Sequence, residues 1–513
     1  MQTARLTLDP AFRIGAVDPR LFGSFVEHLG RCVYTGIYEP GHPQADGSGL
    51  RRDVGDLARE MGVTVVRYPG GNFVSNYRWE DGVGPREDRP VRRDLAWQSI
   101  ETNEFGLGEF MAWTRQVGVE PMMAVNLGTR GLVEALDLLE YCNHPSGTRL
   151  SDLRVANGDA QPYGIRLWCL GNEMDGPWQI GHLTATEYGR RAAETARAMR
   201  SADPSVELVA CGSSGRQMST FGSWEATVLE HCYDLVDYVS MHAYYEELDG
   251  DLDSFLASAV DMDAFIDEVV ATMDHVKAKQ RSRKKLRISF DEWNVWYMRR
   301  PKEKSAEEWP RAPRLLEDEY NLADAVAVGS YLISLLSHAD RVAVACQAQL
   351  VNVIAPIRAE PGGPAWRQTT FHPFAQTARF ARGDALRVEP VAPMLETKAY
   401  GAVPALHATA TYQEEDGQQL GRDHGRGQLS LFAVNRDRRE PLRLSADLRA
   451  FGPLRVAHHL EISGEDHTVT NTQADPDRVV PRTVTDTAVA DGRLEVTLPP
   501  LSWSVINLSA VTP

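Results

Sequence analysis

Residues 165–211 contain two short apolar runs, Ile-Arg-Leu-Trp-Cys-Leu at 165–170 and Val-Glu-Leu-Val-Ala-Cys at 206–211, on either side of a helical pattern at 184–201. Such runs are typical of buried strands, and the strand–helix–strand order is typical of a right-handed crossover between parallel strands. The same order continues to about residue 375. Further strand-like runs occur at 21–25, 63–68, 121–126, 238–242, 286–290 and 342–346, and further helical patterns at 50–61, 107–117, 265–279 and 321–337.

Eight strands alternating with helices predict an α/β fold, a (β/α)8 TIM barrel, because eight parallel units of this kind close naturally into a barrel. A doubly wound open sheet is the alternative. Beyond about residue 376, short alternating strands are separated by Gly, Asp, Pro and Asn, a pattern typical of a β-sandwich, here jelly-roll-like. We therefore expect an N-terminal strand in residues 1–15 (spanning 4–14) that pairs with the sandwich, a barrel at 16–375 and a C-terminal β-sandwich at 376–513. The polar stretch 413–427 resembles a hairpin insertion in that sandwich.

Composition, charge and the absence of certain motifs argue against several classes of protein, among them nucleic-acid-binding, membrane-spanning and metal- or nucleotide-dependent proteins. The 513 residues carry a formal net charge of -17, which argues against a broad nucleic-acid surface. The N-terminus has no apolar signal region, and the longest apolar run, 325–336, is too short to span a bilayer. We therefore expect a cytoplasmic protein with no membrane partner. The six cysteines are scattered and there is no zinc, P-loop or dinucleotide motif, so we expect reduced thiols, no metal and no cofactor.

Polar side chains follow nearly every predicted barrel strand. The C-terminal ends of parallel barrel strands face one mouth, where active sites are built. Glu173 follows the fourth strand and Glu292 the seventh, roughly across the mouth from each other. Two such carboxyl groups suit cleavage of a glycosidic bond, because one protonates the leaving oxygen while the other attacks or activates water. The other polar residues at strand ends are Glu27, His28, Arg67, Asn72, Asn126, Asn172, Ser213, Ser214, His242, Tyr244 and Gln347.

Several neighbours of the two glutamates have possible roles. Asn172 can donate a hydrogen bond to a sugar 2-hydroxyl, and Tyr244 can hold the nucleophile. Asp291 adjoins Glu292, and in a strand of period two only one of these residues can point into the mouth. Candidate orienting groups are His28 and His242, and candidate sugar platforms, with a core position as the alternative, are Trp97, Trp178, Trp293 and Trp296; we expect Asp81 and Asp175 to be loop or cap residues.

Five longer motifs carry a resemblance to a known family. They are Phe-Gly-Ser-Phe-Val-Glu-His-Leu-Gly at 22–30, Arg-Tyr-Pro-Gly-Gly-Asn-Phe at 67–73, Ile-Glu-Thr-Asn-Glu-Phe-Gly at 100–106, Leu-Gly-Asn-Glu-Met-Asp-Gly at 170–176 and Phe-Asp-Glu-Trp-Asn-Val-Trp at 290–296. With these motifs the chain resembles, from end to end, the α-L-arabinofuranosidases of glycoside hydrolase family 51. The match weakens at 107–108 and at 299–313, both of which could border the leaving-group side.

The resemblance implies a barrel with a C-terminal β-sandwich and a two-step retaining mechanism, with Glu173 as general acid/base and Glu292 as nucleophile. It also implies that the arabinofuranosyl ring is held by Glu27, Asn72, Asn172, Tyr244 and Gln347. Members of the family tend to be intracellular hexamers. The implied reaction is release of terminal non-reducing α-L-arabinofuranosyl residues from arabinoxylan- or arabinan-derived oligosaccharides.

The retaining assignment sets a geometric expectation. In retaining enzymes the two carboxyl groups lie roughly 5–5.5 Å apart, whereas a separation above roughly 6.5 Å belongs to inverting enzymes. Two alternatives stay open on the residues alone. One is a β-xylosidase or other exo-glycosidase on the same barrel, because the carboxylate pair does not encode ring size. The other is a non-catalytic carbohydrate-binding protein with the sandwich as its binding module.

Overall fold

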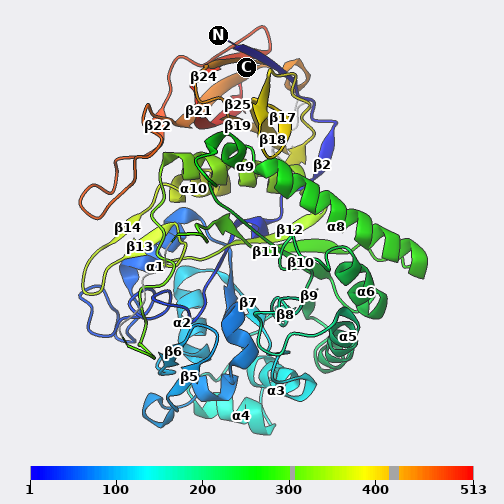
Figure 1. Cartoon of the computed structure of the whole chain (residues 1–513), viewed down its shortest axis with the longest axis vertical. Coiled ribbons are helices and arrows are strands. Elements are labelled where there is room, and N and C mark those ends of the chain that lie inside the picture. Colours follow the sequence, from blue (N-terminus) through cyan, green and yellow to red (C-terminus); the bar gives the residue numbers. More distant parts are fainter. Residues whose placement is uncertain (1, 301–306, 415–426, 512–513) are drawn as a thin grey trace.

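Eight parallel strands form the centre of the larger part of the molecule (Figure 1). The computed structural model describes residues 2–300, 307–414 and 427–511. The strands close into a barrel in the order β10-β11-β12-β3-β4-β7-β8-β9, which confirms the predicted (β/α)8 fold class. They are β3 (Gly23–Phe25), β4 (Val65–Tyr68), β7 (Glu120–Ala124), β8 (Leu167–Leu170), β9 (Glu207–Ala210), β10 (Tyr238–Tyr245), β11 (Arg287–Val295) and β12 (Val342–Gln347).

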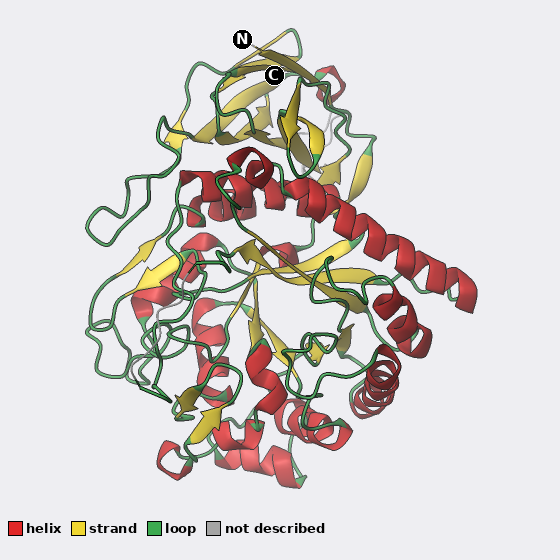
Figure 2. Cartoon of the chain, in the orientation of Figure 1, coloured by secondary structure: helices red, strands yellow, loops and turns green. Residues whose placement is uncertain are grey.

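Helices surround the barrel strands, as the red ribbons of Figure 2 show. One or two follow each strand along the chain, and the amphipathic ones among them bury an apolar stripe, because such a helix is stable only when that stripe is covered. They are α1 (Arg52–Met61), α2 (Leu107–Val117), α3 (Leu132–Asn143), α4 (Arg149–Ala156), α5 (Ala185–Ala202), α6 (Ser223–Cys232), α7 (Leu252–Leu256), α8 (Ala259–Gln280), α9 (Leu322–Ser337) and α10 (Phe371–Phe380).

A β-sandwich lies at one side of the barrel, at the top of Figure 1. Its seven-stranded sheet has the order β2 (Arg13–Ala16), β15 (Asp384–Leu386), β18 (Leu406–Glu414), β19 (Gly427–Asn435), β25 (Ser502–Ala510), β21 (Leu454–Ile462) and β22 (Arg482–Thr483). The four-stranded sheet has the order β1 (Gln2–Thr7), β20 (Leu442–Asp447), β24 (Arg493–Leu498) and β23 (Ala488–Ala490). Three two-stranded sheets complete the described strands: β5 (Arg92–Asp94) with β6 (Ser99–Glu101), β13 (Ile357–Ala359) with β14 (Ala365–Arg367), and β16 (Met394–Thr397) with β17 (Gly401–Pro404).

Helix α9 joins the two parts. Its residues from Leu322 to Leu336 are all buried, because one side of the helix faces barrel elements and another side faces the sandwich strands β18, β19 and β25. A Cβ atom at Gly329 would lie 2.1 Å from Cδ1 of Trp503 in β25, so only glycine permits this close approach. The helix therefore fixes how the sandwich sits on the barrel.

Two predicted strands differ from the structure. The single strand expected at 4–14 is instead β1 and β2, which belong to different sheets, because a turn closed by Asp9 carries the chain across: the amide of Phe12 donates to the carbonyl of Asp9 at 3.1 Å. The first barrel strand begins only at Gly23, because residues 19–22 form a 3-10 helix whose first turn is capped by Asp18. Most of the predicted insertion at 413–427 lies outside the described residues, and the domain boundary near 376 stays a prediction.

Candidate active site

Glu173 and Glu292 lie at the C-terminal end of the barrel. Glu173 follows β8, and Glu292 lies within β11, which extends further than the sequence pattern predicted. One carboxylate oxygen of each lies within 4.8 Å of the other. Glu173 has φ 41°, in the left-handed region that a residue with a side chain rarely adopts, and such backbone strain is often found at functional sites.

Glu292 is buried among hydrogen-bond donors. Nη1 of Arg67 donates to Oε1 at 2.7 Å, and Oη of Tyr244 donates to Oε2 at 2.7 Å. Nδ1 of His242 lies 3.5 Å from the same Oε2. Burial raises the pKa of Glu292 above its ordinary value, and Glu173 adds to the rise. The donors oppose that rise, because each of them stabilises the carboxylate.

Glu173 accepts hydrogen bonds on both carboxylate oxygens. Its Oε1 lies 2.9 Å from Nδ1 of His242, and its Oε2 accepts from Nε1 of Trp178 at 2.7 Å. Trp178 is 51% exposed although it is a large aromatic residue, which places it at the rim of the mouth. The indole N–H can only donate, so the outer oxygen of Glu173 is oriented toward the rim.

Asp291 does not face away from the mouth, as strand alternation predicted. Its Oδ1 lies 3.1 Å from Nε2 of His242, and its Oδ2 lies 3.6 Å from Nε of Arg67. The cause is an irregular register between β10 and β11. Ser240 pairs with Ser289 and His242 pairs with Glu292, so β11 has one more residue than β10 between these two pairs. The same extra residue of β11 appears against β12. A β-bulge interrupts strand alternation, so consecutive carboxylates both reach the interior.

Glu27 collects three further donors. Its Oε1 accepts from the amide of Phe73 and from Nε1 of Trp97, both at 2.9 Å, and its Oε2 accepts from Nε2 of Gln349 at 3.0 Å. Burial raises the pKa of Glu27 to about 8. A Cβ atom at Gly71 would lie 2.5 Å from Oε2 of Glu27, so the tight loop after β4 approaches this carboxylate as closely as glycine allows.

The amide side chains predicted for the site lie at the same end. Nη2 of Arg67 donates to Oδ1 of Asn172 at 2.6 Å, and Nδ2 of Asn172 donates to Oδ1 of Asn72 at 3.3 Å. Gln347, the last residue of β12, donates from Nε2 to Oδ1 of Asn294 at 3.1 Å. Its buried Oε1 has no hydrogen-bond partner among the described residues, which leaves it able to accept from a ligand.

Three of the candidates do not contact this cluster. His28 is buried and bonded to Glu101 at 2.8 Å and to the hydroxyl of Tyr68 at 2.9 Å, so the carboxylate that it contacts is Glu101 and not Glu173 or Glu292. Asn126 caps its own loop by bonding to Tyr77 and Thr129, and Trp293 is a core residue stacked near Phe374 with no exposed surface.

The sugar-platform role of Trp296 stays a prediction, and Asp81 and Asp175 make local polar contacts. Trp296 packs edge-on against Tyr244, with ring centroids 5.0 Å apart. Asp81, expected in a loop or cap, lies in the first turn of a 3-10 helix at Trp79–Gly82 and pairs with Arg92 of β5. Asp175 accepts hydrogen bonds from the amide and hydroxyl of Ser214, and burial raises its pKa to about 6.

Sequence reasoning assigned no role to three residues that organise the site: Arg67, Asp291 and Gln349. Arg67 was visible as a strand-end cation, and a buried arginine beside two predicted acids is a signal for an ion pair. Gln349 follows Gln347 by two residues, but its reach to Glu27 joins the first and eighth loops and has no local signature.

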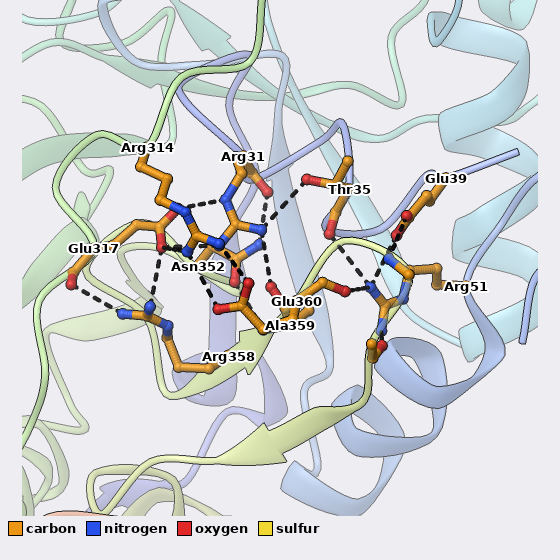
Figure 3. A network of polar contacts seen from close by, with 12 residues as sticks. Arg31, Thr35, Glu39, Arg51, Arg314, Glu317, Asn352, Arg358, Ala359 and Glu360 are labelled. Atoms are coloured by element: carbon orange, nitrogen blue, oxygen red, sulfur yellow. Dashed lines mark hydrogen bonds and ion pairs between the residues drawn. The ribbon is translucent and has the colours of Figure 1, made fainter. Parts of the chain in front are cut away.

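Buried arginines join the loops around the mouth, as Figure 3 shows. Arg31, from the loop after β3, makes a two-point ion pair with Glu317, which follows β11, at 2.6 and 2.8 Å. Glu317 also accepts from Arg358, after β12, at 3.0 Å. Nδ2 of Asn352 donates to the carbonyl of Arg31 at 2.9 Å, which ties the loop that carries Gln349 to the same network.

The spacing of Glu173, His242 and Glu292 would also admit a metal ion, and among the described residues no other group of His, Cys, Asp and Glu does. A histidine that binds a metal offers a free ring nitrogen. Both ring nitrogens of His242 already face carboxylates, so its contacts are accounted for within the protein.

Comparisons with known proteins agree with this geometry. Residues 57–264 match the model of the α-L-arabinofuranosidase 1 domain, and residues 291–502 match that of the α-L-arabinofuranosidase C-terminal domain. An intracellular exo-α-(1→5)-L-arabinofuranosidase from Streptomyces lividans is 62% identical over 100% of this chain and 76% of its own length. The chain belongs to the α-L-arabinofuranosidase family.

The relatives within this family differ in the linkage that they are named for. An exo-α-(1→6)-L-arabinofuranosidase from Bifidobacterium longum is 53% identical, over 99% of this chain and 98% of its own. A solved family 51 α-L-arabinofuranosidase from Bifidobacterium longum superimposes with a TM-score of 0.93 at 50% identity, covering 99% of each chain. These relatives are named for the same sugar, L-arabinofuranose, but for different linkages, α-(1→5) and α-(1→6).

Proposed function

We propose that the chain is a retaining exo-α-L-arabinofuranosidase with Glu292 as its nucleophile and Glu173 as its general acid/base. The observation that carries this proposal is the approach of the two carboxylates to within 4.8 Å across the mouth. Retaining enzymes need a separation of roughly 5–5.5 Å, whereas an inverting enzyme needs room for a water molecule and roughly 6.5–9.5 Å.

The surroundings of each carboxylate suit its role. Glu292 attacks the anomeric carbon, and Arg67 and Tyr244 hold it in its ionised form because both donate to it. Glu173 protonates the leaving oxygen, and a covalent glycosyl-enzyme forms. Glu173, now ionised, takes a proton from water, which attacks the anomeric carbon and releases the sugar with retained configuration.

The arabinofuranosyl ring is held by both hydrogen-bond donors and hydrogen-bond acceptors. Glu27 accepts from ring hydroxyls, Asn172 donates to the 2-hydroxyl next to the reacting carbon, and Asn72 and Gln347 complete the ring of polar contacts. The free Oε1 of Gln347 supports this assignment, because a buried acceptor without a partner in the described protein is satisfied when a hydroxyl group binds.

The proposal extends to the substrates, the location and the assembly of the enzyme. The reaction releases terminal non-reducing α-L-arabinofuranosyl residues from arabinan- or arabinoxylan-derived oligosaccharides. Several relatives are named as intracellular enzymes, which supports a cytoplasmic site of action. None of the described helices is long and apolar enough to cross a membrane. We further propose a homo-oligomer, a hexamer as in the family.

Hydrolysis of p-nitrophenyl α-L-arabinofuranoside, beside the β-D-xylopyranoside and β-D-glucopyranoside, tests the proposal. We expect fast release from the arabinofuranoside, loss of release in Glu292→Ala, and rescue of Glu173→Ala by azide. Glu194→Ala, an exposed glutamate on α5, serves as the control. Release from a pyranoside alone would favour a β-xylosidase or other exo-glycosidase, and sugar binding without release would favour a binding protein. Failure of azide rescue would remove Glu173 from its role.

A further inference from the structure

His242 lies between three carboxylates. It is 2% exposed and belongs to β10. Nδ1 lies 2.9 Å from Oε1 of Glu173 and 3.5 Å from Oε2 of Glu292, and Nε2 lies 3.1 Å from Oδ1 of Asp291. One ring nitrogen therefore faces both residues of the reaction, and the other faces an acid for which the proposed mechanism has no use.

Asp291 is ionised in this setting. Although burial by itself raises a carboxyl pKa, Arg67 and His242 hold the pKa of Asp291 below its ordinary value. Its Oδ2 also lies 3.7 Å from Sγ of Cys169, a weak donor. An ionised carboxylate can only accept, so the hydrogen of this contact sits on Nε2 of His242.

The second ring nitrogen is protonated too. Burial by itself lowers the pKa of His242, but Glu292, Asp291 and Glu173 outweigh it and raise the pKa to about 10. Three further groups of the surrounding strands and loops face the cluster: Arg67 of β4, Asp175 after β8 and Tyr244, two residues along β10. Below that pKa, His242 is an imidazolium, with an N–H directed at the catalytic pair.

We propose that His242, anchored in its charged form by Asp291, is a positioning residue whose Nδ1–H follows the negative charge from Glu292 to Glu173 during glycosylation. The proposal rests on the proposed function. Before the step, Glu292 is a carboxylate and Glu173 a carboxylic acid. Glu292 forms an ester bond to the anomeric carbon and becomes neutral, the bond to the leaving oxygen breaks, and that oxygen takes the proton of Glu173.

The net charge of the pair is therefore minus one before and after the step, but it moves from one residue to the other. The imidazolium keeps its protons throughout and needs to change only the direction of one hydrogen bond. A donor fixed in place can bond to Glu292 before the step and to Glu173 after it with little reorganisation of its surroundings. Such preorganised donors are a main source of electrostatic catalysis in enzymes. Hydrolysis of the glycosyl-enzyme returns the charge by the same route.

The kinetic test uses the 2,4-dinitrophenyl α-L-arabinofuranoside, whose phenolate leaves without a proton, so that its kcat/KM does not depend on protonated Glu173. In the wild type we expect kcat/KM to fall toward pH 10 as His242 loses its charge, separately from any change near pH 8, where Glu27 titrates. Asp291→Asn is expected to move this fall to lower pH by about 1–3 pH units, because an adjacent opposite charge is lost. Asp274→Asn, an exposed partner of Arg341, is the matched control and should keep the wild-type profile.

His242→Gln provides a second variant that keeps an N–H but no charge. We expect its kcat/KM to fall by about 100-fold, the usual cost of losing one preorganised donor, with KM little changed because both ring nitrogens of His242 face carboxylates. An unchanged alkaline limb in Asp291→Asn, or a near-normal rate in His242→Gln, would overturn the proposal.

A readout without turnover separates this proposal from the proposed function. Nuclear magnetic resonance of wild-type enzyme labelled with ¹⁵N-histidine, assigned by comparison with His242→Gln, should show both ring nitrogens of His242 protonated at pH 7 and titrating near pH 10. A neutral ring at pH 7 contradicts the charge-sharing role even if arabinose is released. A charged ring in an enzyme that fails to cleave the arabinofuranoside would refute the substrate assignment instead.

Discussion

The hydroxyl of Tyr244 lies 2.7 Å from Oε2 of Glu292 and donates to it. Both residues are on neighbouring barrel strands, and Tyr244 is fixed in place by the edge-on ring of Trp296. The tyrosine therefore fixes the position of the Glu292 carboxylate through a neutral hydrogen bond from the neighbouring strand.

Tyr244→Phe should lower kcat strongly. A hydrogen bond to a charged group is worth about 1.5–3 kcal/mol, so we expect a loss of roughly 10- to 150-fold on p-nitrophenyl α-L-arabinofuranoside. Tyr245→Phe is the matched control, since the hydroxyl of Tyr245 bonds to Asp261 at 3.3 Å instead. Equal effects of the two changes would argue that packing, and not the hydrogen bond, matters.

Gly71→Ala should impair sugar binding. The added methyl group would lie 2.5–2.6 Å from the carboxylate of Glu27, which three donors hold in place. We expect a rise in KM and a loss of stability of about 1–3 kcal/mol, as in other overpacked sites. Gly108→Ala in α2 meets nothing within 4 Å and should instead stabilise the protein by about 0.4–1 kcal/mol. Thermal unfolding and initial rates on p-nitrophenyl α-L-arabinofuranoside measure both variants, and a normal KM in Gly71→Ala would contradict the tight fit.

Glu317→Gln should destabilise the loops around the mouth. Glu317 is almost fully buried and neutralises Arg31 and Arg358, so its loss leaves buried cations without their partner. Breaking a buried ion pair in this way costs about 3–5 kcal/mol. Glu389→Gln, which disrupts only the exposed pair with Arg387, should change stability by less than about 1 kcal/mol. Denaturant titration followed by tryptophan fluorescence measures the difference, and similar losses in both variants would show that the network is not important.

The junction between barrel and sandwich should respond to acid through His407. Nδ1 of this partly buried residue of β18 lies 2.7 Å from the hydroxyl of Ser330 in α9. Burial, with Arg436 nearby, lowers the pKa of His407 to about 3, whereas in the unfolded chain it is about 6.5. The unfolded state therefore binds more protons between these values, so stability falls as the pH drops below about 6.5.

The slope attributable to one such group is at most about 1.4 kcal/mol per pH unit. We expect the melting temperature of the wild type to fall more steeply between pH 6 and pH 4 than that of His407→Gln, which has no proton to gain. Differential scanning calorimetry of the two proteins checks this. Parallel pH profiles would mean that His407 accepts its proton without loss of the fold.

Local patterns along the chain determined the architecture. Strand-like runs such as 165–170 and 206–211, with a helical segment between them, are enough to predict a parallel barrel, because the period of apolar residues reports which face of each element is buried. Placing Glu173 and Glu292 at the mouth follows from the same counting, since all eight strands run in one direction. The end of a strand and the character of the residue that follows it are local properties.

Only the tertiary structure showed which hydrogen bonds and ion pairs the site residues make. The extra residue of β11 turns Asp291 toward His242, and strand alternation could not foresee it, because a bulge is defined only against the neighbouring strands. Gln349 reaches Glu27 across 322 positions of sequence, and Arg67 reaches Glu292 across 225. Such contacts depend on the closure of the barrel, which brings distant strand ends together and buries their charges where water cannot screen them.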